Sequence, residues 1–445
     1  MFSPSALADV LHRLGLSPET PLKVAFSGGL DSCVLLHALC ALRKELPWRF
    51  GAVHVDHGLQ PASASWAHHA EKFCEDLNVP CAVERVVITT TEIHEQGLEA
   101  AARQARYACL ARHVGAGEVL LTAHHVDDQA ETVLLQLMRG SGTHGLAAMP
   151  EIASFSAGRL ARPLLGFTRA QLADYAEREK LQWVDDPSNR DPRFSRNYLR
   201  HQVFPLLEAR WSGATRQIAR AAGLSAEAAG LLDSLAEADW HACQGAQDAA
   251  LSVAALRLLP APRQRNLVRY WLRRQGFQAP SAMHLEHILA QVAHEPRTRH
   301  AAVCWPQAEV HRYRDELVVL RARREMDSSA RLSWNLSEPL EIPGVGRLRA
   351  VATRGDGLSQ ERIGGAPLMV GWRQGGETCQ LPGRAHHHKL KKLLQEASIP
   401  PWERQRLPLV YAHGALAAIG DRWVCEPYAA RAGEPAWKLR FELVI

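Results

Sequence analysis

The stretch Lys23–Leu36, KVAFSGGLDSCVLL, decides how the first part of the chain folds. An apolar run ends in two glycines, and a helix is predicted to begin near Asp31. Glycines without a Cβ allow a tight turn, and the N–H groups of the helix start can then face an anion. The alternative is a plain strand-to-helix turn, which the complete SGGLDS pattern disfavours. We therefore expect a phosphate-binding loop made by Ser27, Gly28, Gly29, Leu30, Asp31 and Ser32.

The chemistry of this loop differs from that of a kinase-type loop. It lacks the GxxxxGK[ST] pattern, so a cradle for a γ-phosphate is disfavoured. Asp31 is the predicted Mg²⁺ ligand, because a carboxylate can hold an ion that bridges phosphate oxygens.

Strand-like and helix-like segments alternate through the first half of the chain. Apolar runs such as RFGAVHVDH (49–57) and EVLLTAHH (118–125) are each followed by a helical pattern. This alternation predicts βαβ units with a parallel sheet, and polar clusters stand where the strands end. Sites in such sheets form at that edge. The predicted class is α/β, with a Rossmann-like N-terminal domain resembling the adenine nucleotide alpha hydrolases.

The length of 445 residues predicts more than one domain. We expect the α/β domain at 1–215, a mostly helical and basic domain at 225–325, and a small α+β domain at 340–445. The net charge of +5 is a weak indication of a polyanionic partner.

Targeting signals and cysteine pairs are not evident in the sequence. No run approaches the ~18 apolar residues of a membrane span, and the N-terminus does not read as a signal peptide. The nine cysteines form no CxxC and are expected to be reduced thiols. The sequence thus predicts a cytoplasmic protein without membrane attachment, and it assigns no oligomeric state.

SGGLDS resembles the pyrophosphate-binding loop of the N-type ATP pyrophosphatases, the PP-loop superfamily. In that superfamily ATP is cleaved between its α- and β-phosphates, an oxygen nucleophile takes the AMP, and the loop retains pyrophosphate. Its members include several synthetases and tRNA-modifying enzymes, so the loop alone does not choose among them.

Other motifs narrow the choice. They are HVDHGLQ (54–60), TAHHVDDQAET (122–132), RGSGTHGLAAM (139–149), WVDDPSNRDPRFSRNYLRHQVFPLL (183–207) and LKKLLQEASIPPWERQRLPLV (390–410). Together with Glu99, Arg103, Arg106 and Tyr107, they resemble the tRNA(Ile)-lysidine synthetase family over nearly the whole chain. The resemblance implies a ligase that uses ATP and Mg²⁺ to join free L-lysine to the 2-carbonyl carbon of a cytidine. This is the wobble cytidine of tRNA(Ile) with a CAU anticodon. The reaction passes through an adenylated cytidine, and its product switches the tRNA from methionine to isoleucine identity.

The carboxylates Asp127 and Asp128 stand beside His124 and His125 at a strand end. Such a group could bind the lysine cation and accept its proton. The same aspartates also suit a helix start, and capping is compatible with catalysis. We predict Asp31, His124, Asp127 and Asp128 as catalytic residues, preferring His124 to His125 and leaving open which aspartate is the base.

Two further segments, the end of the second strand and the helix that contains Arg103, carry predicted binding residues. Asp56 follows the second strand and is expected to border the nucleotide. Glu99, Arg103 and Arg106 have the spacing of helix-face ion pairs, which is typical of a solvated helix face. The resemblance implies instead a wall of the ATP or lysine site, and the solvated face stays the alternative.

Basic residues later in the chain are predicted to contact tRNA. Forked and amide donors of Arg196, Asn197 and Arg200 suit the reading of anticodon bases, although a surface linker helix is the alternative. Two basic patches suit phosphate contacts, although solvated surface is again the alternative. They comprise Arg265, Arg269, Arg273 and Arg274 in one patch, and Lys389, Lys391 and Lys392 in the other.

Two rival functions remain. A tRNA thiolase with the same loop would be expected to use a dedicated cysteine or a cysteine-bound cluster, and no CxxC occurs. A tRNA-binding protein without turnover would not need Asp31, Asp127 and Asp128 together.

Overall fold

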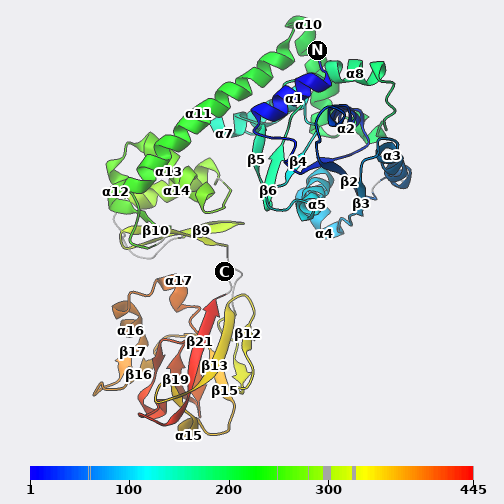
Figure 1. Ribbon diagram of the computed structural model, residues 1–445. Helices are drawn as coiled ribbons and strands as arrows, with labels where there is room; N and C mark the ends of the chain where they lie inside the picture. Colours follow the sequence, from blue (N-terminus) through cyan, green and yellow to red (C-terminus); the bar gives the residue numbers. More distant parts are fainter. Residues whose placement is uncertain are drawn as a thin grey trace. The chain divides into compact units, whose positions relative to one another are not determined.

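The computed structural model describes the chain except residues 59, 61, 248, 279, 294–301, 323–326 and 444–445, and except the side chains of 92, 95, 96, 99 and 443. It divides into two compact units, Met1–Leu232 and Asp233–Ile445 (Figure 1). The division falls inside one helix, α11 (Ala214–Ala242), which therefore links the two units. The finer boundaries at 1–215, 225–325 and 340–445 stay a prediction.

The first unit is built on a six-stranded sheet with the strand order β3-β2-β1-β4-β6-β5. Its strands are β1 (Leu22–Ala25), β2 (Phe50–Asp56), β3 (Cys81–Arg85), β4 (Val119–Leu121), β5 (Ile152–Phe155) and β6 (Gly158–Ala161). Five strands run parallel, and β5 pairs antiparallel with β6. Since β1 lies between β2 and β4, the loops after these three strands share one edge, which confirms the predicted α/β class.

Helices cover both faces of this sheet (Figure 1). They are α1 (Pro4–Arg13), α2 (Leu30–Arg43), α3 (Ser63–Asp76), α4 (Thr90–Gln96), α5 (Leu98–Arg112), α6 (Val126–Met138), α7 (Thr143–Leu146) and α8 (Arg169–Arg178). One core contains Leu7, Leu39 and Leu172 from α1, α2 and α8. A second core contains Leu110 from α5 packed with Leu120 from β4. Both faces being buried explains the continuous apolar strands in the sequence.

The hairpin of β5 and β6 was not predicted from the sequence. Its turn places Ser156 at φ 52°, where a glycine would have been the usual signal. Gly158 starts β6 because a Cβ there would stand 2.3 Å from the carbonyl oxygen of Glu118.

After α8 the chain follows a short helical path to the second unit. It contains the 3₁₀ turn η1 (Pro187–Arg190), α9 (Ser195–Tyr198), the π-helical turn η2 (Leu199–Val203) and α10 (Phe204–Arg210). A π turn inside a helical run shifts the side chains that follow it, and such turns are frequent at functional sites.

The second unit begins with helices and a small sheet. The helices are α12 (Val253–Leu258), α13 (Ala261–Arg274) and α14 (Ala282–Ala293), and the strands are β7 (Leu251–Ser252), β8 (Val303–Trp305), β9 (Ala308–Tyr313) and β10 (Glu316–Arg321). Their core gathers around Trp271, which is fully buried. The predicted patch of Arg265, Arg269, Arg273 and Arg274 lies on α13.

The rest of the second unit is rich in strands. One sheet contains β11 (Leu332–Trp334), β15 (Leu368–Gly371), β18 (Leu409–Ala412), β19 (Ala415–Ile419) and β20 (Trp423–Val424). Another contains β12 (Leu340–Ile342), β13 (Gly346–Arg354), β21 (Pro435–Leu443) and β14 (Leu358–Ser359). The described part of this unit also contains a two-stranded ribbon, three α-helices and a 3₁₀ turn: β16 (Thr378–Cys379), β17 (His388–Lys389), α15 (Gln360–Ile363), α16 (Leu390–Glu396), α17 (Pro401–Arg404) and η3 (Glu426–Tyr428).

Two details of this part differ from what the sequence predicts. The pattern HHHKLKKLLQEA (386–397) predicts a helix ended by Pro400 and Pro401, whereas His388–Lys389 form β17, α16 begins at Leu390, and Pro401 begins α17. Cys379 and Cys425, expected as reduced thiols, form a disulfide.

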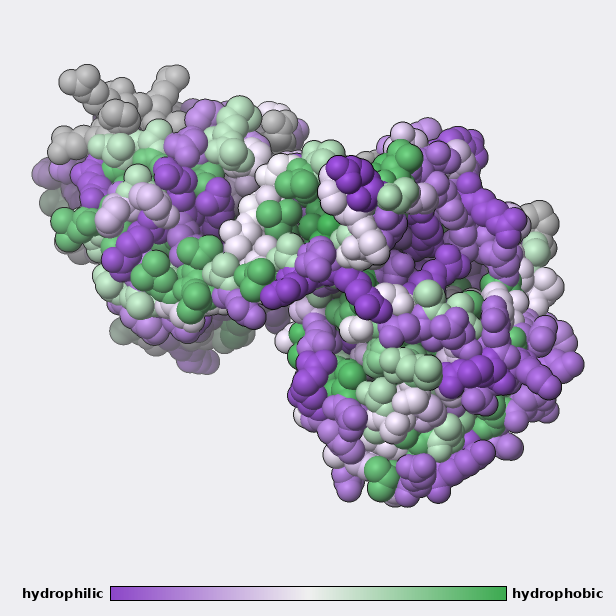
Figure 2. Space-filling model, turned by 90° about the horizontal axis from the view of Figure 1, so that it is seen from above, coloured by the Kyte–Doolittle hydropathy of each residue, from purple (hydrophilic) through white to green (hydrophobic). Residues whose placement is uncertain are grey.

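The surface carries the usual mixture of residues. On the face seen in Figure 2, hydrophobic residues are interspersed with hydrophilic ones. Among the described residues, no helix combines the length and the apolar character that crossing a bilayer requires.

Candidate active site at the carboxyl edge of the parallel sheet

The glycine loop joins β1 to α2 with the geometry expected of an anion cradle. Gly28 has φ +79°, a backbone conformation that residues with a Cβ rarely adopt. Gly29 is the N-cap residue of α2, and in the described part no side chain caps this helix start. The Ser32 hydroxyl donates to the Gly29 carbonyl at 2.9 Å and lies 3.1 Å from the Ser27 hydroxyl. The N–H groups at the start of α2 are therefore free of a side-chain cap and can bind a phosphate.

A later segment closes over this loop. The Val184 amide donates to the Gly28 carbonyl at 2.9 Å, so the chain after α8 is fixed to the phosphate loop. This contact brings the conspicuous motif 183–207 to the same edge of the sheet as Asp31.

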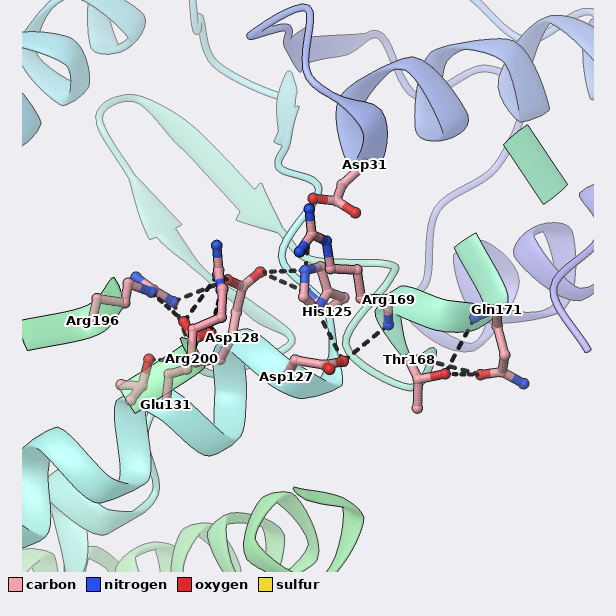
Figure 3. Close-up of polar contacts among 11 residues, drawn as sticks. Asp31, His125, Asp127, Asp128, Glu131, Thr168, Arg169, Gln171, Arg196 and Arg200 are labelled. Atoms are coloured by element: carbon pink, nitrogen blue, oxygen red, sulfur yellow. Dashed lines mark hydrogen bonds and ion pairs between the residues drawn. The ribbon is translucent and has the colours of Figure 1, made fainter. Parts of the chain in front are cut away.

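His125 is the centre of a charged cluster at the start of α6. Its Nε2 lies 3.6 Å from Asp31 Oδ2 and 3.3 Å from Asp128 Oδ2, and its Nδ1 lies 3.3 Å from Asp127 Oδ2. Figure 3 shows the imidazole between Asp31 on α2 and the two aspartates on α6. The cluster arises because β1 and β4 are neighbours, so the loops after them meet.

The three carboxylates determine the protonation of His125. Burial alone would lower its pKa, but Asp128, Asp127 and Asp31 outweigh burial and raise the pKa to about 10. Burial would raise the pKa of Asp128, yet His125, Arg196 and Arg200 hold it at about 2. At neutral pH the cluster therefore combines the imidazolium of His125 with the ionised carboxylates of Asp127 and Asp128, whose pKa values are both lowered.

Asp128 belongs to a second, more buried ion network. Glu131, one turn further along α6, is 1% exposed. It accepts from Arg196 Nε at 2.6 Å and from Arg200 Nε at 2.7 Å. Both guanidinium groups also reach Asp128 Oδ1, at 3.2 Å and 3.3 Å. Two arginines thus fix the orientation of both carboxylates (Figure 3).

His124 points into different surroundings from His125. Its Nδ1 lies 2.8 Å from the Thr122 hydroxyl. Burial lowers its pKa to about 3, helped by Arg162, Arg196 and Arg103 and opposed by Asp128. His124 is therefore a neutral imidazole, and among the described residues it makes no hydrogen bond or ion pair with Asp31 or Asp127.

The predicted wall on α5 is only partly described, because the side chain of Glu99 lies outside the described residues. The Arg103 guanidinium stacks over the Tyr107 ring at 4.8 Å, and that of Arg106 lies 5.7 Å from the same ring. Burial, together with Arg103 and Arg196, lowers the pKa of Arg106. Because Arg196 belongs to the ion network and its charge acts on Arg106, the cations of α5 lie near that network.

Five other predicted residues lie in three places. Asp56 ends β2, and its Oδ1 accepts from the Gly58 amide at 2.8 Å. Asn197 is buried and donates to the carbonyls of Ser188 and Asp191, so it holds its own loop together. The third place is in the second unit, where Lys389, Lys391 and Lys392 are exposed.

Sequence reasoning missed the importance of His125 and Glu131. Glu131 is not among the predicted site residues, although its spacing of three from Asp128 places both on one helix face. That spacing was the available signal, but the arginine partners are 65 and 69 residues away in the chain.

Comparison with known proteins identifies the class. The family model described as "PP-loop domain" matches residues 5–207, which contain the glycine loop and the parallel sheet. The first unit is thus a PP-loop domain that binds ATP.

Two further family models match later parts of the chain: "TilS substrate binding domain" at 251–318 and "TilS substrate C-terminal domain" at 368–441. The tRNA(Ile)-lysidine synthase of Alkalilimnicola ehrlichii is 46% identical over 434 residues, covering 97% of this chain and 96% of the relative. That of Coxiella burnetii is 39% identical over 443 residues, covering 99% and 97%. The chain belongs to the tRNA(Ile)-lysidine synthase family and is an ATP-dependent carbon–nitrogen ligase that modifies tRNA.

Solved structures resemble parts of the chain at lower similarity. The U34-tRNA thiolase NcsA from Methanococcus maripaludis is 20% identical, covers 49% of this chain and 77% of its own, and has a TM-score of 0.42. A TilS C-terminal domain is also 20% identical, covers 26% and 99%, and has a TM-score of 0.22.

Proposed function

We propose that this protein joins the ε-amine of free L-lysine to the 2-carbonyl carbon of the wobble cytidine in tRNA(Ile) with a CAU anticodon. The cytidine oxygen attacks the α-phosphorus of ATP, pyrophosphate leaves, and the lysine amine then displaces AMP. The main observation behind this proposal is that the His125 cluster joins the phosphate loop, through Asp31, to the carboxylates of α6.

The ATP end of the site is assigned to the glycine loop. Residues 27–32 would hold the pyrophosphate portion through backbone N–H groups and the hydroxyls of Ser27 and Ser32. Asp31 is the proposed Mg²⁺ ligand, since in the described part its buried Oδ1 accepts no hydrogen bond. When bound, the ion would neutralise phosphate charge. Asp56, at the end of the neighbouring strand, is placed at the nucleotide border.

The lysine end is assigned to the two aspartates of α6. Asp128 has the lowered pKa of about 2, which keeps it ionised and suits it to hold an ammonium group. Asp127 is more accessible, at 36% exposure, and is the proposed proton acceptor. The sequence favours His124 as the functional imidazole of this site. We assign that role to His125 instead, because His125 contacts all three aspartates. Protonated at neutral pH, it positions these carboxylates rather than acting as a base.

The roles first predicted for the 195–203 segment are revised. Arg196 and Arg200 are proposed to orient Asp128 and Glu131, and Asn197 to stabilise its loop, since their donors are already used there. Arg103 and Arg106, and Glu99 beside them on α5, remain proposed walls of the ATP or lysine site. In the second unit, the exposed lysines 389, 391 and 392 are proposed to contact tRNA phosphates.

The experiment incubates the protein with tRNA(Ile) bearing CAU, ATP-Mg²⁺ and labelled lysine, followed by nucleoside analysis. Labelled lysidine with stoichiometric AMP and pyrophosphate is expected. Release of ADP and orthophosphate without adenylyl transfer would refute the proposal. Asp127→Asn and Asp128→Asn should accumulate adenylated tRNA, and rapid lysidine formation by both variants would refute the lysine site.

A further inference from the structure

A second group of metal-ligating side chains lies away from the phosphate loop, at the other end of α5 from Arg103. Cys109 and His113 stand one helical turn apart at the end of α5, and Glu84 lies on β3. The three donor atoms all lie within 4.8 Å of one another, and His113 Nε2 is 3.0 Å from Glu84 Oε1. No residue of this group belongs to the ATP or lysine site described above.

The three donors suit a particular class of ion. A thiolate, an imidazole and a carboxylate are the ligands of Zn²⁺ and of similar ions such as Co²⁺, whereas Mg²⁺ prefers oxygen alone. With bonds of about 2.0–2.3 Å, the donors of a tetrahedral site stand about 3.3–3.8 Å apart, so closure by roughly 1 Å is needed. Cys109 is 1% exposed and fixed in the core, while His113 and Glu84 are partly exposed and can move toward it.

We propose that Glu84, Cys109 and His113 form a binding site for Zn²⁺ or another borderline divalent cation. The ion would tie the end of α5 to the edge strand β3, with three protein ligands and a fourth position open to solvent. On binding, the Cys109 thiol loses its proton to solvent and the sulfur–metal bond forms, so no oxidant or reductant is involved. The site would stabilise α5, the helix that also carries Arg103 and Arg106.

The same contacts have a metal-free explanation that the experiment must separate. Arg112 Nη2 lies 3.6 Å from Glu84 Oε2 and 3.5 Å from Cys109 Sγ. Glu84 could therefore simply be the ion partner of Arg112 and His113. An ion pair of that kind needs no thiolate, so replacing the sulfur distinguishes the two explanations.

The test uses the full chain, dialysed against a chelator under reducing conditions and titrated with Co²⁺. We expect one equivalent to give a thiolate-to-Co²⁺ charge-transfer band, which Zn²⁺ abolishes and excess Mg²⁺ leaves unchanged. Cys109→Ser should remove the band, and His113→Gln, which removes a direct ligand, should weaken Co²⁺ binding by more than the roughly 10–100-fold that loss of an outer-shell partner costs. Cys304→Ser, which removes an exposed free thiol in the second unit, is the matched control and should keep the band.

Two results would overturn the proposal. The first is the absence of a thiolate band when the unmodified chain is saturated with Co²⁺. This measurement does not depend on the folding of any variant. The second is a band that survives in Cys109→Ser. Thermal unfolding gives an independent measurement, because Zn²⁺ should raise the melting temperature of the unmodified chain and of His113→Gln at higher concentration, but not that of Cys109→Ser.

Discussion

Replacing Glu131 by glutamine tests whether the buried ion network is structural. The substitution keeps the shape of the side chain and removes its charge. Glu131 is 1% exposed and accepts three hydrogen bonds from arginines, at 2.6, 2.7 and 3.1 Å. In Glu131→Gln, Arg196 and Arg200 retain only Asp128 as a shared counter-ion, and the new amide group offers one acceptor in place of two.

Two bounds give the expected loss of stability. Losing a single hydrogen bond between charged groups costs about 1.5–3 kcal/mol. Removing one partner of a fully buried ion pair costs about 3–5 kcal/mol. Since the arginine side chains are 25% and 22% exposed, water compensates part of the higher figure. We expect a loss of about 3 kcal/mol, which corresponds to a roughly 150-fold larger equilibrium constant for the opening of α6.

Hydrogen exchange of the α6 amides is the suitable assay, because it measures this helix separately from the second unit. Glu151→Gln is the matched control: Glu151 pairs with Arg13, but the two side chains are 40% and 56% exposed. This exposed pair should contribute about 0–1 kcal/mol, so exchange should change by less than tenfold. If α6 exchanged no faster in Glu131→Gln than in Glu151→Gln, the network would have no structural role.

Three other predictions address the ATP loop, the lysine patch of the second unit and the imidazole of His124. Asp31→Ala should abolish pyrophosphate release while tRNA affinity, measured by filter binding, stays within about twofold; unchanged turnover would exclude a metal role for this carboxylate. Replacing Lys389, Lys391 and Lys392 by alanine should reduce the salt slope of tRNA binding by roughly 2–3, since each phosphate contact contributes about 0.7–0.9; an unaltered slope would mark ordinary surface. The pKa of His124 is lowered to about 3, whereas it is about 6.5 in the unfolded chain. The neutral imidazole therefore makes its full contribution to stability above about pH 6.5, and this contribution is lost as the pH falls toward 3. Between pH 7.5 and 5 the loss is about 2 kcal/mol, and His124→Gln should lack it in urea unfolding; equal losses in both proteins would disprove the buried neutral imidazole.

The parallel sheet could be predicted because its signals are local and periodic. Each buried strand of the first unit is an apolar run, and the glycines between β1 and α2 mark a turn that few other sequences adopt. The β5–β6 hairpin could not be predicted in the same way, because its strands have four residues each and its positive φ falls on Ser156. The disulfide of Cys379 was missed for another reason: its partner is 46 residues away, and spacing alone does not reveal a contact.

The candidate site was predictable at the level of strands but not of side chains. Neighbouring β1 and β4 bring Asp31 to the aspartates of α6, as the topology requires. The choice between His124 and His125 depends on which of two successive residues turns toward the loop. At a strand end the backbone changes from extended to helical, and the alternation that orients strand side chains no longer applies. Here His125 is the extended N-cap residue of α6, and this places its ring among the aspartates.

The arginines of the motif at 183–207 show why donor chemistry alone misassigns a role. Arg196 and Arg200 look equally suited to RNA in the sequence, yet both are held by the buried Glu131, and releasing them would leave that charge without a partner. Arg190 and Arg193 have carboxylate partners too, but their side chains are 75% and 87% exposed, and an exposed ion pair costs little to exchange for a phosphate. We therefore expect RNA to be contacted by the exposed pair of arginines, while the buried pair positions the carboxylates that lysine must reach.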